Sequence, residues 1–194
     1  AWSYNFLLNN QTAQALWLSL VAHEYFHTWN VKRIRPKELG PFDYLKENYT
    51  TMHWLTEGLT SFMDELFVLR SDLCSLEEYL NMQTKNLKRY FDTPGKKFHS
   101  LEQSSFNAWI KLYKPDENTH NSSISYYLKG GLVFSTLHFE FKKAGKNIND
   151  LLAMLWKRYK DNPKEGLETY EVMDMIDPLL VKKFVIPLSL EFQQ

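Results

Sequence analysis

The sequence predicts a mainly α-helical protein with little or no β-sheet. Apolar residues recur at intervals of three and four along several long segments, which is the spacing of one helix face. Capping patterns open some of these segments, and Gly or Pro residues end them. With 194 residues, of which 44% are hydrophobic, the chain can bury one good core, so we expect one domain or a large piece of one.

The first two helices are bounded by a proline and by a loop. The first is predicted over about 12–30 and stops before Arg35-Pro36, because a residue that precedes proline avoids the helical conformation. A loop over 36–48 follows, and the second helix is predicted over about 51–69. Its apolar face consists of Leu55, Leu59, Phe62, Leu66 and Leu69, and a different face carries Glu57, Ser61 and Asp64.

Capping and breaker residues mark the remaining helices. Ser75-Leu76-Glu77-Glu78 is a capping box that opens a third helix to about residue 91, and Asp92-Thr93-Pro94-Gly95 ends it. The stretch 96–121 is polar, aromatic and irregular, with a short helix expected after Ser100. Further helices are predicted over 123–143, over 149–160 with Asn149 as the cap, and over 169–176, and the tail 183–188 is predicted to be extended.

Composition and charge exclude several classes of protein. The formal net charge is zero and the pI is about 7.2, so nothing favours a nucleic-acid or membrane-surface partner. A single cysteine, Cys74, excludes an internal disulfide. No apolar run is long enough for a membrane-spanning helix, and the first residues do not resemble a signal peptide. We therefore expect a cytoplasmic location.

A His-Glu-x-x-His motif over residues 23–27 is the most informative feature of the chain. On a helix, His23 and His27 lie on one face, where both rings can reach one metal ion. Glu24 is rotated by about 100° from His23, which suits a general base that acts on a metal-bound water. Glu57 in the second helix offers a third ligand, and the four side chains together are typical of a zinc hydrolase.

The alternative is a surface helix whose two histidines have no role. Leu16 and Leu20 precede the motif and share one helical stripe with both histidines, so the histidines are predicted to point toward the core. That orientation, together with Glu57 in a second helix, favours the metal site. The remaining histidines lie outside the motif and receive no role; they are His53, His99, His120 and His138.

Several segments over about residues 20–177 carry a resemblance to one known family. They include the stretch from His23 to Pro36, Trp54-Leu55-Thr56-Glu57-Gly58, Ser105-Phe106-Asn107-Ala108-Trp109 and Ser125-Tyr126-Tyr127-Leu128-Lys129-Gly130. In these segments the chain resembles the glycyl aminopeptidase family of gluzincin zinc metallopeptidases. The resemblance implies the helical portion of a thermolysin-like gluzincin catalytic domain. It also implies removal of N-terminal residues, with a preference for Gly or Ala, and a bacterial origin.

The resemblance also implies roles for single residues. Glu24 would be the base, and the ligands of Zn²⁺ would be His23, His27 and Glu57. An oxyanion needs a hydrogen-bond donor besides the metal. The resemblance implies Tyr127 for that role, with Tyr126 as the second candidate and a packing role as the alternative. Asp64 resembles the acidic partner that orients the first histidine, and a solvated carboxylate is its alternative.

Two departures from the family pattern bear on the domain organisation. The family carries an upstream Gly-Gly-Leu-Glu-His stretch, whose Glu resembles the anchor for the α-amine of the substrate, and nothing in residues 1–21 matches it. The family also usually carries a PDZ-like module after the catalytic helices, and this sequence stops before such a module. We expect 1–180 to be a zinc metallopeptidase catalytic domain, incomplete on its N-terminal side, and 181–194 to be an extended tail or the start of a further module.

Two other functions stay open beside the aminopeptidase. An endopeptidase would use the same zinc site, and a peptide-binding module would keep the groove without the activity. In each case the expected partner is a peptide, with no nucleic acid and no membrane. An aminopeptidase does not cleave peptides with a blocked N-terminus, so such peptides distinguish it from an endopeptidase. Metal content measured together with activity distinguishes an enzyme from a binding module.

Overall fold

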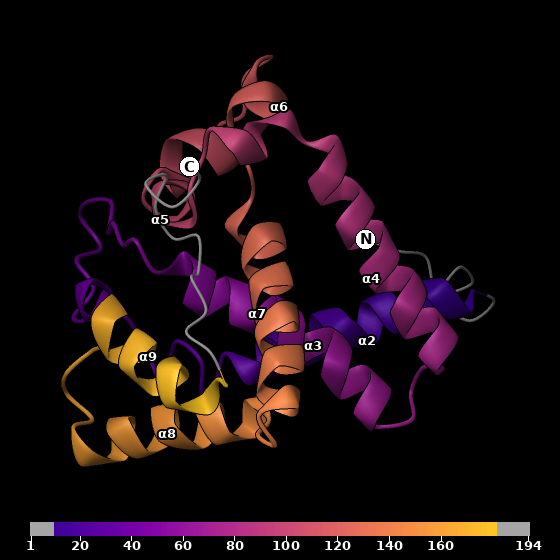
Figure 1. The fold of residues 1–194 in the computed structure, drawn as a ribbon. Coiled ribbons are helices and arrows are strands. Elements are labelled where there is room, and N and C mark those ends of the chain that lie inside the picture. The colour runs from indigo at the N-terminus through magenta and orange to yellow at the C-terminus, as the bar shows by residue number, and fades with distance from the viewer. Residues whose placement is uncertain (1–9, 182–194) are drawn as a thin grey trace.

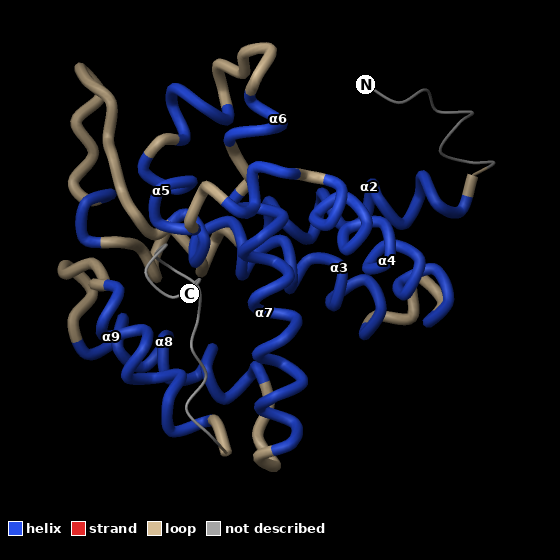
Figure 2. The backbone as a smooth tube through the Cα atoms, turned by 45° about the horizontal axis from the view of Figure 1, so that its top comes forward, coloured by secondary structure: helices blue, strands red, loops and turns tan. Residues whose placement is uncertain are grey.

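The computed structural model describes residues 10–181, which form helices joined by loops (Figure 1). The α-helices are α2 (Gln11–Phe26), α3 (Thr60–Arg70), α4 (Leu76–Asp92), α5 (Leu101–Phe106), α6 (Thr119–Ser122), α7 (Tyr126–Lys143), α8 (Ile148–Asp161) and α9 (Thr169–Ile176). Over this range there is no strand (Figure 2), and β contacts are limited to two isolated bridges, Asn30–Ile34 and Pro36–Leu167. The prediction of a mainly α fold is confirmed.

Shorter helical turns of other types connect the α-helices. Two are π-helical, namely η2 (Trp54–Leu59) directly before α3 and η4 (Ala108–Leu112) after α5. The others are 3-10 turns, namely η1 (Lys37–Leu39), η3 (Pro94–Lys97) and η5 (Asp177–Leu179). Across residues 10–181, no helix is both long and apolar enough to cross a membrane.

Helix α7 runs through the middle of the molecule and packs against η2 and α3 (Figure 1). The two backbones meet at Gly58 and Gly130, where a Cβ added to Gly58 would lie only 2.7 Å from the Cα atom of Gly130. Glycine is required for such a close approach. Below this contact, the rings of Trp54 and Phe134 stack with centroids 5.7 Å apart in the core. The contact therefore brings the segment that carries Glu57 against the start of α7.

The remaining helices surround this central contact. Helix α2 packs along α3, and α4 lies across the flank of α7 and α3 (Figures 1 and 2). Helices α8 and α9 pack near the other end of α7, away from α2 (Figure 1). The candidate residues predicted from the motif consequently lie where α2, η2, α3 and the start of α7 meet.

The helix boundaries differ from the sequence prediction in several places. The first helix ends at Phe26, and residues 27–29 form turns. The predicted second helix begins as the π-helical η2, and the helix expected from Ser123 begins at Tyr126. Helix α8 is capped by Asn147 instead of Asn149, since the Asn147 side chain accepts from the Asn149 backbone at 2.8 Å. Periodicity does not mark such ends, and the tail 183–188 lies outside the described residues.

The predicted apolar stripe on the first helix is wrong in one respect. Leu16 is 42% exposed and Leu20 is 50% exposed, so neither faces the core. The buried positions of α2 include Ala15, Ser19 and Phe26 instead. Their spacing places them on one side of the helix, where two small side chains allow α2 to approach α3 closely. The buried face of α2 therefore follows the small size of its side chains, and hydrophobicity alone does not predict it.

Candidate metal site

The structure brings His23, His27 and Glu57 together from two separate segments. His23 lies on α2, His27 is the C-cap residue of that helix, and the carboxylate lies on η2, in the π-helical turn before α3. One ligand atom from each residue lies within 4.8 Å of the others. The Oε2 atom of Glu57 is 3.2 Å from His23 Nε2 and 3.3 Å from His27 Nε2. Three donor atoms of these types converging on one point are suited to a single transition-metal ion.

Each histidine is oriented by a second contact through its Nδ1 atom. His23 Nδ1 lies 2.8 Å from Oδ2 of Asp64 on α3, and His27 Nδ1 lies 2.8 Å from the backbone oxygen of Asn30. The two rings stand edge to face, with centroids 4.7 Å apart. Such contacts fix the orientation of a metal-binding imidazole and direct its Nε2 atom toward the metal. The structure therefore places Asp64 where the sequence analysis expected the orienting carboxylate.

Asn30 is a structural residue of this site that the sequence analysis missed. Its buried side-chain amide donates to the backbone oxygens of Leu55 and Thr56 and to the hydroxyl of Thr60, at 2.9 to 3.1 Å. Its own backbone oxygen accepts from His27. Asn30 thus joins the end of the first histidine segment to the segment that carries Glu57. The sequence shows only that a polar residue stands three positions after His27. The first helix was predicted to extend to residue 30, so Asn30 was not expected to bind another segment.

The carboxylates of Asp64 and Glu57 both contact His23, and they favour positive charge at the histidines. Burial lowers the pKa of His23, but its hydrogen bonds with Asp64 and Glu57 outweigh burial and raise this pKa to about 9. Burial raises the pKa of Glu57, while the contacts with His23 and His27 lower it to about 2. Two carboxylates around one imidazole are stabilised either by protons on the histidines or by a metal dication. The donor set, with both Nδ1 atoms engaged, fits a zinc ion.

Glu24 and Tyr127 are the two candidate catalytic residues besides the ligands. Glu24 is exposed on α2, between the two histidines in sequence. Tyr127, in the first turn of α7, is half-buried, and its ring centroid is 6.2 Å from that of His23. Its hydroxyl lies 3.3 Å from that of Tyr113, a contact that the sequence analysis did not anticipate. Tyr126 is 2% exposed and stacks on His53, away from the histidine ligands.

Burial keeps the tyrosine hydroxyls protonated. It raises the pKa values of both Tyr126 and Tyr127 well above the usual value. A protonated hydroxyl can donate a hydrogen bond but cannot act as a base at neutral pH. Of these two tyrosines, the geometry places Tyr127 nearer to His23.

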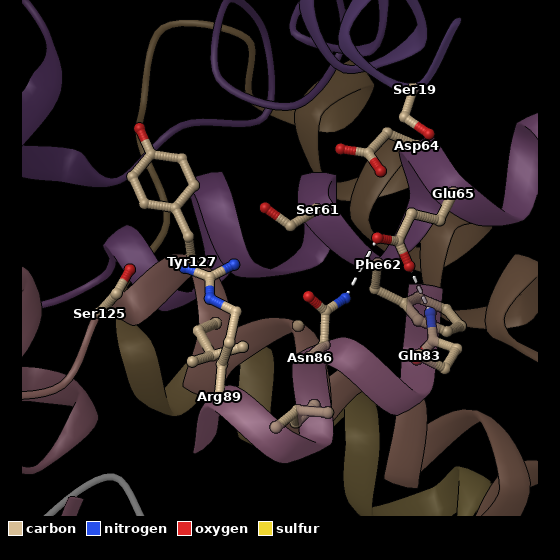
Figure 3. Close-up of a pocket in the computed structure, with 13 residues that line it drawn as sticks. Ser19, Ser61, Phe62, Asp64, Glu65, Gln83, Asn86, Arg89, Ser125 and Tyr127 are labelled. Atoms are coloured by element: carbon tan, nitrogen blue, oxygen red, sulfur yellow. Dashed lines mark hydrogen bonds between the residues drawn. The ribbon is translucent and has the colours of Figure 1, made fainter. Parts of the chain in front are cut away.

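A polar cavity of about 210 Å³ adjoins the cluster (Figure 3). We call it the site cavity; its wall includes Asp64, Glu65, Asn86, Arg89 and Tyr127. Glu65 accepts hydrogen bonds from the side chains of Asn86 and Gln83 on α4. Arg89 extends from α4 toward Tyr127 in Figure 3. The space next to the candidate ligands is thus polar, and its wall carries the acidic side chains of Asp64 and Glu65 and the cationic side chain of Arg89.

Glu65 provides a prediction about stability and pH. Burial, aided by the negative charge of Asp64, raises its pKa from 4.5 to about 7. Since the folded-state pKa is the higher one, the protonated carboxyl stabilises the fold fully below pH 4.5, and this stabilisation is lost as the pH rises through about 7. Glu65→Gln cannot ionise. Between pH 5 and pH 8, the free energy of unfolding of the wild type should fall relative to the variant by about 2 kcal/mol.

Urea denaturation at several pH values measures this difference. The difference between the unfolding free energies of the two proteins removes the contribution of every other titrating group, provided that the dependence on urea concentration is the same for both. Parallel curves for wild type and Glu65→Gln would contradict the assignment of a raised pKa to Glu65.

A mainly helical domain in which the two histidines of a His-Glu-x-x-His motif meet a glutamate from a separate segment has the features of a metallopeptidase. The chain belongs to the M61 glycyl aminopeptidase family, whose model matches residues 16–133. It is thus a member of a peptidase family, as the resemblance in its motifs indicated.

Solved structures include a similar protein. The crystal structure of an aminopeptidase N family protein from Idiomarina loihiensis is 30% identical in sequence and superposes with a TM-score of 0.78. The match covers 90% of this chain and 32% of that one, so the chain spans about a third of the length of the protein it resembles. A comparison with curated proteins finds no match.

Proposed function

We propose that the protein is a zinc-dependent metallopeptidase, and that it acts as an aminopeptidase that releases N-terminal Gly or Ala. The observation that carries the zinc dependence is the convergence of His23, His27 and Glu57 within 4.8 Å. The preference for Gly or Ala rests on the glycyl aminopeptidase family alone. Residues 1–180 would form the catalytic domain.

Zinc would be held by the Nε2 atoms of both histidines and by the Glu57 carboxylate, with Asp64 and Asn30 keeping the rings in place. When bound there, zinc supplies Lewis-acid activation of a water molecule and of the scissile carbonyl. Three protein ligands leave a further coordination position for the substrate side, which is the arrangement of a catalytic site and not of a structural one.

The proton transfers fall to Glu24. Its exposed carboxylate follows His23 on α2 and can accept the proton of the attacking water. The same carboxyl group then returns that proton to the nitrogen of the leaving amine. Tyr127 donates its hydroxyl hydrogen to the carbonyl oxygen as that oxygen gains negative charge.

Tyr127→Phe is expected to lower kcat by about 10²–10³ and to change KM little. The variant removes only the hydroxyl, and the hydrogen bond is strongest when the carbonyl oxygen is most negative. Steady-state kinetics on an alanyl substrate measure both constants. Tyr113→Phe, which removes the 3.3 Å contact to Tyr127, should have a smaller effect. A larger loss in Tyr126→Phe than in Tyr127→Phe would show that the two neighbours are assigned in the wrong order.

The function is tested by metal analysis combined with hydrolysis assays. The purified protein should contain about one zinc per chain and should release the dye from alanyl and glycyl conjugates. N-acetylation of the substrate should abolish the reaction. Cleavage of acetylated peptides would instead identify an endopeptidase, and zinc binding without hydrolysis of either substrate would identify a binding module.

A further inference from the structure

A second cavity, of about 400 Å³, opens where α4 ends and α7 begins. Its wall includes Arg89, His99, Lys111, His120, Ser125 and Leu128, and we call it the basic cavity. Arg89, Ser125 and Leu128 also line the site cavity, so the two spaces adjoin at the first turn of α7. The side chain of Arg89 thus borders both the basic cavity and the cavity that Tyr127 and Asp64 line.

The basic cavity carries unneutralised positive charge. Among residues 10–181, neither Arg89 nor Lys111 forms a salt bridge, although both lie on its wall. The one carboxylate on that wall, Asp92, is taken by Lys88 at 2.6 Å, outside the cavity lining. Asp116 interacts electrostatically with Lys111, but it lies outside the cavity lining, where its carboxylate accepts from Thr119 and Asn118. Cations that lack a partner attract an anion.

His99 lies on the same wall and holds a buried ring N–H. Its side chain is buried, since the residue is only 6% exposed. The Nδ1 atom accepts the backbone N–H of Ile124 at 3.2 Å, which places the ring proton on Nε2. Burial lowers the pKa of His99, so the ring is neutral and keeps this single proton. The Nε2 atom has no partner among the described residues, and a buried donor without an acceptor is costly.

The start of α7 adds to the attraction for an anion. Helix α7 has 18 residues, and its N-cap residue, Ser125, forms no side-chain capping bond. The first backbone N–H groups of a helix have no partner inside the helix and carry a partial positive charge. Ser125 and Leu128 border the basic cavity, so this helix end faces the space that Arg89, His99 and Lys111 surround.

We propose that the basic cavity binds a carboxylate of the peptide substrate, with Arg89 and Lys111 as the cations and His99 as a further donor. The inference rests on the proposed peptidase function, because the adjoining site cavity is lined by Asp64 and Tyr127, which lie beside the candidate zinc ligands. The carboxylate is either the C-terminus of a short peptide or an acidic side chain on the leaving side of the scissile bond. A short peptide held in this way is selected by its length as well as by its first residue.

Binding without turnover tests the inference directly. Calorimetry on the zinc-loaded Glu24→Gln protein compares Ala-Ala-Ala with Ala-Ala-Ala-amide and with Ala-Ala-Glu-amide. The free carboxylate should bind about 10-fold more tightly than the amide, which is the low end for a charged hydrogen bond because Arg89 is exposed. Tight binding of Ala-Ala-Glu-amide would identify the side chain as a source of the carboxylate. Equal affinity for all three peptides, or no measurable binding of any, would overturn the proposal.

Substitution of the cation identifies the residue that is responsible. Arg89→Gln should remove the difference between acid and amide, and Arg89→Lys should restore part of it because the charge remains. Lys85→Gln is the matched control, since Lys85 is an exposed cation on α4 outside both cavity linings. A difference that survives in Arg89→Gln and is lost in Lys85→Gln would contradict the proposed site.

Kinetics separate this inference from the proposed function. With active protein, amidation should raise KM about 10-fold and leave kcat nearly unchanged, since the carboxylate lies away from the reacting bond. Hydrolysis that is indifferent to the carboxylate would overturn the basic cavity and leave the peptidase intact. Binding that depends on the carboxylate, without any hydrolysis by the wild type, would support the cavity and sink the peptidase.

Discussion

His27→Ala is expected to reduce zinc content from about one ion per chain to near zero and to abolish hydrolysis. The Nε2 atom of His27 lies 3.3 Å from the Glu57 carboxylate and would supply one of three protein ligands. Its loss leaves the metal under-coordinated, and the affinity falls with the number of ligands. Alanine favours the helical conformation, so α2 should form in the variant. Elemental analysis after dialysis gives the metal content, and circular dichroism checks the fold.

His23→Ala should behave in the same way, and His120→Ala serves as the control. His120 lies on α6, outside the cluster of candidate ligands, so its removal should leave the zinc content unchanged. Unchanged metal content in both His23→Ala and His27→Ala would disprove the ligand assignment.

Glu24→Gln is expected to retain zinc and the fold while lowering kcat by about 10²–10⁴. The amide is nearly isosteric with the carboxylate but cannot accept the proton of the attacking water. The Glu24 side chain is exposed and forms no hydrogen bond within residues 10–181, so its replacement should not disturb α2. Stopped assays at saturating substrate measure kcat, and elemental analysis confirms that the metal is retained.

Glu77→Gln is a matched control for this change. It makes the same substitution at an exposed acid on α4, far along the chain from the motif, and should turn over like the wild type. Activity of Glu24→Gln close to the wild-type level would show that another group accepts the proton.

The sequence could predict the helical class and the two histidines because both depend on local geometry. Residues four apart share a helix face in any α-helix, so His23 and His27 could be paired without knowledge of the fold. The capping box at Ser75 is equally local, and the structure contains it. The pairing of Glu57 with these histidines came from its motif and from the family resemblance, since its spacing of 30 residues from His27 fixes no distance.

Features that depend on contacts between distant segments required the structure. The side-chain amide of Asn30, just after the end of α2, binds backbone atoms of residues 55 and 56, and no local pattern encodes those partners. The buried face of α2 is set by small side chains against α3, whereas the prediction relied on Leu16 and Leu20. In both cases the partner lies more than 20 residues away in the chain, beyond the reach of helical periodicity.

The sequence alone therefore determined the residue types of the candidate zinc site and the helix that carries two of them, because helical spacing is a property of neighbouring residues. Tertiary structure alone decided how Glu57 meets those histidines, which of two adjacent tyrosines lies beside them, and where cavities form. The close approach of Gly58 and Gly130 joins η2 to α7, and the turn of α7 then buries Tyr126 and leaves Tyr127 near His23. Adjacent residues on a helix point about 100° apart, so only the packing of that helix determines which of them faces the site.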